Sequence, residues 1–167
     1  ILKDAAANRV EYRLNLNTGA RVLVPGSVAE GLQIVTAYYP ELRSIYADTS
    51  MTETQRVAKF MTYIADDFQR IDGTANQKSD LETVTLDRFN RWTIAQYKFD
   101  LLNINAIDSS TIEVETEMSI LAESKTIAGS RVTVDVTPNP KIIWKLYGTS
   151  WKIFKGLPYT SAELNGI

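Results

Sequence analysis

Two alternating, aromatic segments near the C-terminus constrain the fold of this chain more than any other feature. Residues 142–147 and 151–155 alternate apolar and polar side chains, and a Gly-Thr-Ser turn joins them. A period of two indicates strands with one buried face, and a short Gly-containing turn between two such strands predicts an antiparallel hairpin. This hairpin follows a helical first half, so the sequence predicts an α+β domain.

Three more strands are predicted before the hairpin. Residues 112–120 alternate Ile, Val, Thr and Met with Glu and Ser, which is typical of a sheet with one dry and one wet face. Residues 92–107 predict a long strand, bulged around Asp100, and residues 132–136 carry valine at every second position. Together with the hairpin, these segments predict an antiparallel sheet of four to six strands.

The first half of the chain contains three helix starts. Each has the pattern of a capping box, in which Ser or Thr is followed three residues later by Glu or Gln: Ser27 with Glu30, Thr52 with Gln55, and Ser79 with Glu82. We expect Pro40 to kink or break the first helix, because proline lacks an N–H donor and restricts the preceding residue. We expect the second helix to stop near Asp66, residues 68–72 to form a short strand, and the third helix to reach about Asn90.

The N-terminal residues predict a separate hairpin. Residues 10–16 alternate in polarity, Asn17-Thr18-Gly19 supplies turn chemistry, and residues 21–24 return. The preceding Asp4-Ala5-Ala6-Ala7-Asn8 resembles a turn in bacterial immunoglobulin-like surface modules, which implies a longer, exported parent protein. We therefore divide the chain into an N-terminal hairpin or module tail (1–26), an α+β domain (27–160) and a C-terminal tail (161–167).

Composition excludes several classes of site. The 167 residues contain no cysteine and no histidine, which excludes disulfides, thiolate ligands, Ser-His-Asp triads and most zinc sites. A net charge of −2 with scattered Lys and Arg argues against a nucleic-acid partner. The longest uncharged runs are far shorter than the roughly 18–20 apolar residues that a membrane span needs. We therefore expect no cofactor, no metal, no nucleic acid and no membrane span.

Residues 27–157 resemble the nuclear-transport-factor-2-like superfamily, also called the cystatin-like cone fold. The resemblance is carried by the segment 63–73, YIADDFQRIDG, and by the closing pattern Trp144-x-x-Tyr147-Gly148-x-x-Trp151-Lys152-Ile153. It implies a strongly bent antiparallel sheet wrapped around about three N-terminal helices, a cone with a pocket. Members include ketosteroid isomerases, scytalone dehydratase, limonene epoxide hydrolase and binding or dimerising modules, so the resemblance implies a fold and leaves the function open.

Asp72 is the candidate general base. In ketosteroid isomerases a catalytic aspartate lies on the strand after the second helix, and a carboxylate in a dry cone holds a raised pKa. Tyr63 is the candidate hydrogen-bonding hydroxyl, with Tyr38 and Tyr39 as alternatives. Equally, Asp72-Gly73 is a common turn sequence. The isomerase set is incomplete, because no aspartate in the later strands lies convincingly on an apolar face.

Aromatic residues supply the candidate ligand-binding positions, namely Tyr38, Trp92, Tyr97 and Trp144. Such residues line pockets for flat apolar ligands, and they also form sheet cores and dimer faces. Two acidic groups, Asp66-Asp67 and the glutamates of 113–117, are interpreted as solvated surfaces rather than metal sites.

The sequence therefore favours a non-catalytic domain of an exported bacterial protein, at the periplasm or cell surface. We expect it to bind a small apolar molecule in the cone, or to form a homodimer through the outer sheet face. One alternative is an isomerase or hydratase type of enzyme that uses Asp72 with a helix tyrosine. The other is a structural spacer beside immunoglobulin-like modules.

Overall fold

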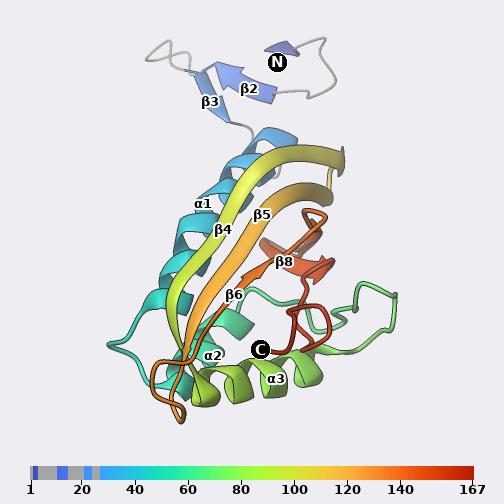
Figure 1. Ribbon diagram of the computed structural model, residues 1–167. Coiled ribbons are helices and arrows are strands. Elements are labelled where there is room, and N and C mark those ends of the chain that lie inside the picture. The colour runs from blue at the N-terminus through green and yellow to red at the C-terminus, as the bar shows by residue number, and fades with distance from the viewer. Residues whose placement is uncertain (1, 4–10, 15–20, 24–26) are drawn as a thin grey trace.

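The computed structural model describes residues 2–3, 11–14, 21–23 and 27–167 (Figure 1). Its elements are, in chain order, β1 (Leu2–Lys3), β2 (Glu11–Leu14), β3 (Arg21–Leu23), α1 (Val28–Ala47), α2 (Glu53–Met61), α3 (Lys78–Arg91), β4 (Trp92–Asp108), β5 (Thr111–Ser124), β6 (Arg131–Asp135), β7 (Lys141–Tyr147) and β8 (Ser150–Lys155). Three helices thus precede the strands of a curved sheet, as the sequence predicted.

The N-terminal strands form a small antiparallel sheet in the order β1-β2-β3. Tyr12 is opposite Leu23, and Leu14 is opposite Arg21, which confirms the strands of the predicted N-terminal hairpin. The turn predicted at residues 17–19 and the immunoglobulin-like segment 4–8 lie outside the described residues.

The main sheet has the order β4-β5-β7-β8, and β6 also pairs with β5. β7 and β6 share one edge of β5 end to end, because β7 pairs with residues 111–115 and β6 with residues 119–123. Between them, residues 136–140, which we call the rim loop, leave the sheet. Two main-chain hydrogen bonds of 3.0 Å hold this loop, from Val136 N to the Met118 carbonyl and from Thr116 N to the Pro140 carbonyl.

The sheet bends around the helices, and β4 and β5 curve together across α1 (Figure 1). Register shifts at three places along β4, near residues 95, 102 and 107, locate β-bulges, which bend and twist a strand. Alternate residues of β5 are buried towards the helices: Ile112, Val114, Thr116, Met118, Ile120 and Ala122. The predicted α+β cone with a bent antiparallel sheet is therefore confirmed.

The helix boundaries differ from prediction in three places. α1 continues through Pro40, which lies exposed inside the helix, because Tyr39 and Leu42 on either side are buried against the sheet. That packing outweighs the lost hydrogen bond. α2 ends at Met61 instead of near Asp66, and α3 starts after Gln77 without a side-chain cap, so the box predicted at Ser79 does not form.

The strand predicted at residues 68–72 is also wrong, and β8 explains why. β8 pairs with residues 63–65, which precede the predicted strand. Ile153 N donates to the Tyr63 carbonyl at 2.7 Å, and Ala65 N donates to the Ile153 carbonyl at 3.0 Å. A single parallel bridge forms at Ile64, and the chain then passes through turns.

The C-terminal segment, residues 156–167, packs into the core. Its buried residues are Leu157, Pro158, Tyr159, Leu164 and Ile167. Leu164 and Ile167 belong to the stretch that we predicted as a C-terminal tail, yet they contact the same hydrophobic cluster as the helices and the sheet. Among the described residues, no helix combines the length and apolar character that crossing a membrane requires.

Candidate functional site

Asp72 lies in an exposed turn rather than in an apolar pocket. Its side chain is 61% exposed and forms an ion pair of 3.8 Å with the Nε of Arg70. Thr74 N donates to its Oδ1 at 2.9 Å. This backbone hydrogen bond lowers the pKa of the Asp72 carboxyl below its ordinary value. A general base in the cone requires the opposite, burial and a raised pKa, so the geometry gives Asp72 no support in that role.

The hydroxyl of Tyr63, the predicted partner of Asp72, is hydrogen-bonded to α1 instead. It donates a hydrogen bond to the Glu41 carboxylate of α1, and burial raises the pKa of the phenol. The structure does bring three predicted residues together: the ring of Tyr38 lies 5.0 Å from that of Tyr63 and 5.7 Å from that of Trp144, between centroids. These rings form an aromatic contact between α1 and the sheet, apart from the Asp72 turn.

Aromatic rings occupy the middle of the cone. Tyr39 stacks on Phe99 at 4.9 Å, Phe99 on Tyr97 at 5.6 Å, and Tyr97 on Tyr46 at 4.0 Å. Tyr97, a predicted ligand-binding residue, is thus a member of a buried stack, and Trp144 is fully buried beside it. Trp92 is partly buried against the same cluster. The structure places these aromatic residues in core packing.

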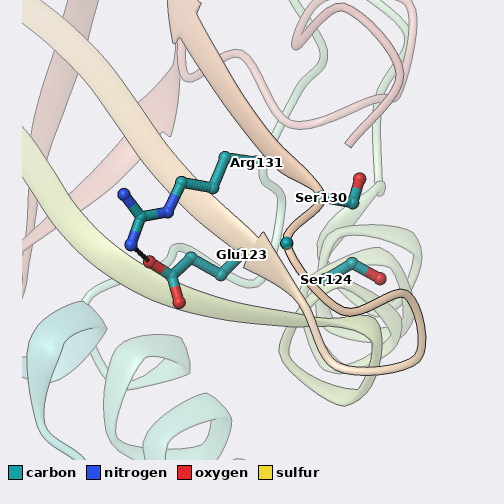
Figure 2. Close-up of a pocket in the computed structure, with 5 residues that line it drawn as sticks. Glu123, Ser124, Ser130 and Arg131 are labelled. Carbon is teal, nitrogen blue, oxygen red and sulfur yellow. Dashed lines mark ion pairs between the residues drawn. The ribbon is translucent and has the colours of Figure 1, made fainter.

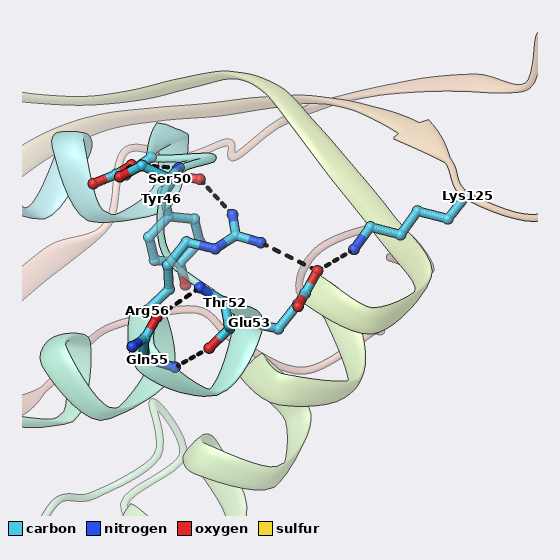
Figure 3. A network of polar contacts seen from close by, with 8 residues as sticks. Tyr46, Ser50, Thr52, Glu53, Gln55, Arg56 and Lys125 are labelled. Carbon is cyan, nitrogen blue, oxygen red and sulfur yellow. Dashed lines mark hydrogen bonds and ion pairs between the residues drawn. The ribbon is translucent and has the colours of Figure 1, made fainter.

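Polar groups inside the cone form hydrogen bonds and ion pairs that connect its helices to its strands. The Tyr39 hydroxyl and Thr116 Oγ1 lie 3.0 Å apart, and burial raises the pKa of Tyr39 to about 12. Figure 3 shows a second network, in which buried Arg56 donates to the Tyr46 carbonyl at 3.1 Å and approaches Glu53. Glu53 in turn pairs with Lys125 at 2.6 Å. This network joins the end of α1 to α2 and to the chain after β5.

The main hollow with an apolar lining lies at the rim of the sheet, outside the cone. We call it the rim groove. It has a volume of about 700 Å³ and lies between the rim loop, the ends of β7 and β8, and the C-terminal segment. Its apolar lining comes from Ile71, Val136, Pro138, Pro140, Ile143, Pro158 and Ala162. This volume is within the range of small-molecule sites in proteins.

The walls of the rim groove are held in place by the main chain. Gly156 has a φ of +93°, and a Cβ there would overlap the Lys141 carbonyl oxygen, so the chain turns closely against β7. The Glu163 carboxylate accepts hydrogen bonds from Tyr159 N at 2.8 Å and from Thr160 N at 2.9 Å. These contacts fix the C-terminal wall, while the bonds of the rim loop to β5 fix the other.

A second hollow, of about 460 Å³, lies at the turn end of the β5–β6 hairpin (Figure 2). Its lining is Glu123, Ser124, Gly129, Ser130 and Arg131, with no large apolar side chain. Arg131 pairs with Glu123 along one side of it. Because this ion pair already satisfies both charges, the rim groove is the better candidate site.

The outer face of the sheet carries charged side chains in cross-strand pairs. Lys98 contacts Glu117 at 2.7 Å, and Lys141 contacts Glu113 at 3.4 Å. Charged residues are depleted from the cores of protein interfaces. A homodimer through this face remains a prediction, and it would have to cover these ion pairs.

No protein-family model and no curated protein matches the sequence. Solved structures do match: a conserved protein from Planctomyces limnophilus has a TM-score of 0.56 at 15% identity, covering 76% of this chain and 92% of that one. An NTF2-like protein of unknown function in nutrient uptake from Rhodospirillum rubrum has a TM-score of 0.50 at 17% identity, covering 72% and 93%.

The fold is nuclear-transport-factor-2-like. Proteins that share it include enzymes: a type 2 hexachlorocyclohexane dehydrochlorinase has a TM-score of 0.50 at 13% identity, covering 77% of this chain and 82% of the enzyme. At these identities the similarity shows the nuclear-transport-factor-2-like fold alone, and the function has to be argued from the site.

Sequence reasoning missed the rim groove. Its signals were present as Pro138-Asn139-Pro140, which we interpreted as an interruption between strands, and as Lys155 followed by Gly156 at the end of the last strand. Neither signal shows which segments meet, because the groove combines the rim loop with a C-terminal segment about twenty residues further along.

Proposed function

We propose that this protein is a non-catalytic binding domain that takes a small apolar molecule into the rim groove. The observation that carries the proposal is a groove of about 700 Å³ whose lining is mainly apolar. Ile71, which lines the groove, is 46% exposed. A ligand in the groove would remove this apolar surface from water, which favours binding.

The chemistry of the groove supports binding rather than catalysis. Glu163 is committed to two backbone N–H groups, and Lys141 is paired with Glu113. Outside the groove, the predicted base Asp72 keeps a lowered pKa in water. General acid–base catalysis needs a pKa close to the working pH, and the predicted pair of Asp72 with a helix tyrosine does not provide one.

The proposal is tested with N-phenyl-1-naphthylamine, a neutral fluorophore that brightens in apolar sites. We expect saturable binding to the wild-type protein and about tenfold weaker binding to Ile71→Glu, because the new carboxylate would lose water on ligand binding. Ile107→Glu is the matched control, since Ile107 is 59% exposed and lies outside the groove. Equal loss in both variants, or no binding to the wild type, would refute the proposal.

A structural spacer is the second candidate, and the aromatic packing inside the cone supports it. A spacer predicts that no probe binds saturably. We also propose that the protein is exported, on the resemblance of residues 4–8 to immunoglobulin-like surface modules. Fractionation of cells that produce the full-length protein tests this, since recovery in the cytoplasm alone would exclude export.

A further inference from the structure

We propose that the rim groove selects apolar molecules that carry an anionic group, such as a carboxylate, and that Lys155 supplies the opposing charge. This inference rests on the proposed function, because it concerns the same groove. It is carried by the partners of the charged side chains around the groove and by the position of Lys155 next to exposed apolar surface.

The other charged residues of the lining each have a charge or donor close by. Lys141 pairs with Glu113 at 3.4 Å, and Glu163 accepts the two backbone N–H groups of the C-terminal segment. Asp135 is close enough to Lys98 for its charge to contribute to the raised pKa of that lysine. The chief cause of the raised pKa is the hydrogen bond of Lys98 to Glu117. None of these groups offers a free cation to a ligand.

Lys155 is different. Within the described part of the chain, no carboxylate lies within 4.0 Å of its ammonium group. Asp72 feels the charge of Lys155, but the Asp72 carboxylate is exposed and has Arg70 at 3.8 Å. An anion in the groove would therefore meet a cation to which the described residues bring no carboxylate within 4.0 Å.

The position of Lys155 suits an amphipathic ligand. Lys155 is opposite Ile143 in the β7–β8 register, so both side chains lie on the same face of the sheet. Its Nζ lies 3.9 Å from the place that a Cβ on Gly73 would take, next to the turn that carries Ile71. Lys155 is thus the strand neighbour of Ile143 and reaches the turn that carries Ile71, and a ligand would place its apolar body on these two residues and its anion at the ammonium group.

The test compares two probes that differ by one sulfonate group. The anionic probe is 8-anilinonaphthalene-1-sulfonate, and N-phenyl-1-naphthylamine is its neutral parent. Lys155 is only half-buried, and the remaining contact with water keeps the electrostatic gain modest. We therefore expect the anionic probe to bind the wild type about threefold to tenfold more tightly than the neutral probe at low salt. Salt should reduce this preference.

Variants assign the preference to one residue. We expect Lys155→Gln to bind both probes equally and Lys155→Arg to retain the preference for the anion. Lys59→Gln, on the exposed surface of α2 and outside the groove, should behave as the wild type. If Lys155→Gln still binds the anionic probe more tightly than the neutral probe, as the wild type does, the inference is overturned. The proposed function then remains intact, provided that the neutral probe still binds. If neither probe binds the wild type, the proposed function fails, and this inference fails with it.

Discussion

Arg88, on α3, donates a hydrogen bond to the main-chain carbonyl of Tyr159 in the C-terminal segment. Each of these residues is only 1% exposed. A buried guanidinium needs acceptors, and within the described residues the Nε of Arg88 has no partner. The bond therefore ties the C-terminal segment to the helix layer, and with it one wall of the rim groove.

Tyr159 is expected to anchor that wall. Its hydroxyl donates to Asp80 at 2.9 Å, and its ring packs near Phe68. Tyr159→Ala removes a buried aromatic ring and should lower the free energy of unfolding by about 3–5 kcal/mol. Tyr159→Phe removes only the hydroxyl and should cost about 1 kcal/mol. Urea unfolding measures both, and a change below about 1 kcal/mol in Tyr159→Ala would show that the segment adds little stability.

Gly156 and Gly148 form a matched pair for testing the turn into the groove. Both have positive φ, +93° and +63°, but only Gly156 is crowded, by the Lys141 carbonyl. Gly148→Ala should cost about 1–2 kcal/mol, from backbone strain alone. Gly156→Ala adds a steric overlap and should cost about 2–5 kcal/mol in total. Equal losses in thermal or urea unfolding would contradict the close approach of Gly156 to β7.

Stability should fall at alkaline pH because of Tyr39. Burial raises the pKa of its phenol from 10.0 to about 12, so between these values the unfolded chain loses the proton while the folded chain keeps it. The contribution of Tyr39 is complete below pH 10 and is lost as the pH rises to 12, about 3 kcal/mol in all. Urea unfolding at pH 9 and 11 should show a steeper decline for the wild type than for Tyr39→Phe. Parallel declines would place Tyr39 in water.

Asp72→Asn tests whether Asp72 lies outside the groove and affects ligand binding only through its negative charge. The amide keeps an acceptor for Thr74 N and removes the negative charge near Lys155. We therefore expect the anionic probe to bind about twofold to fivefold more tightly, since exposed charge pairs contribute little, and the neutral probe to bind unchanged. Loss of neutral-probe binding would place Asp72 inside the site.

Most of the fold was predictable, because its strands alternate and its turns use characteristic residues. The hairpin of β7 and β8 forms around Gly148, as its aromatic alternation predicted, and α2 begins with a reciprocal capping box between Thr52 and Gln55. The effect of Pro40 was misinterpreted because the sequence around it shows only the missing N–H donor. It does not show the sheet on which the helix packs. The strand at 68–72 was wrong because the segment leaves β8 after Gln69 N donates to the Phe154 carbonyl at 2.8 Å. It then closes a turn, in which Arg70 N donates to the Thr74 carbonyl and Gly73 N to the Arg70 carbonyl.

The candidate site was less predictable than the fold. Sequence reasoning selected Tyr97 and Trp144 for a pocket, and both lie in core packing, because an aromatic residue on the concave face fills a cone as readily as it lines one. The apolar residues of the rim groove are prolines and aliphatic side chains, and they stand among polar and charged residues of the same segments. They form a site only through the meeting of segments that are distant in the sequence.

The most direct test of the rim groove is an NMR titration of the ¹⁵N-labelled protein with 8-anilinonaphthalene-1-sulfonate. We predict saturable shifts of amide signals in residues 71–74, 135–141 and 155–157, the segments that meet around the groove. Shifts concentrated at Tyr39, Tyr97 and Phe99 would place the ligand in the cone instead. That result, or the absence of saturable shifts, would contradict the assignment of the rim groove as the binding site.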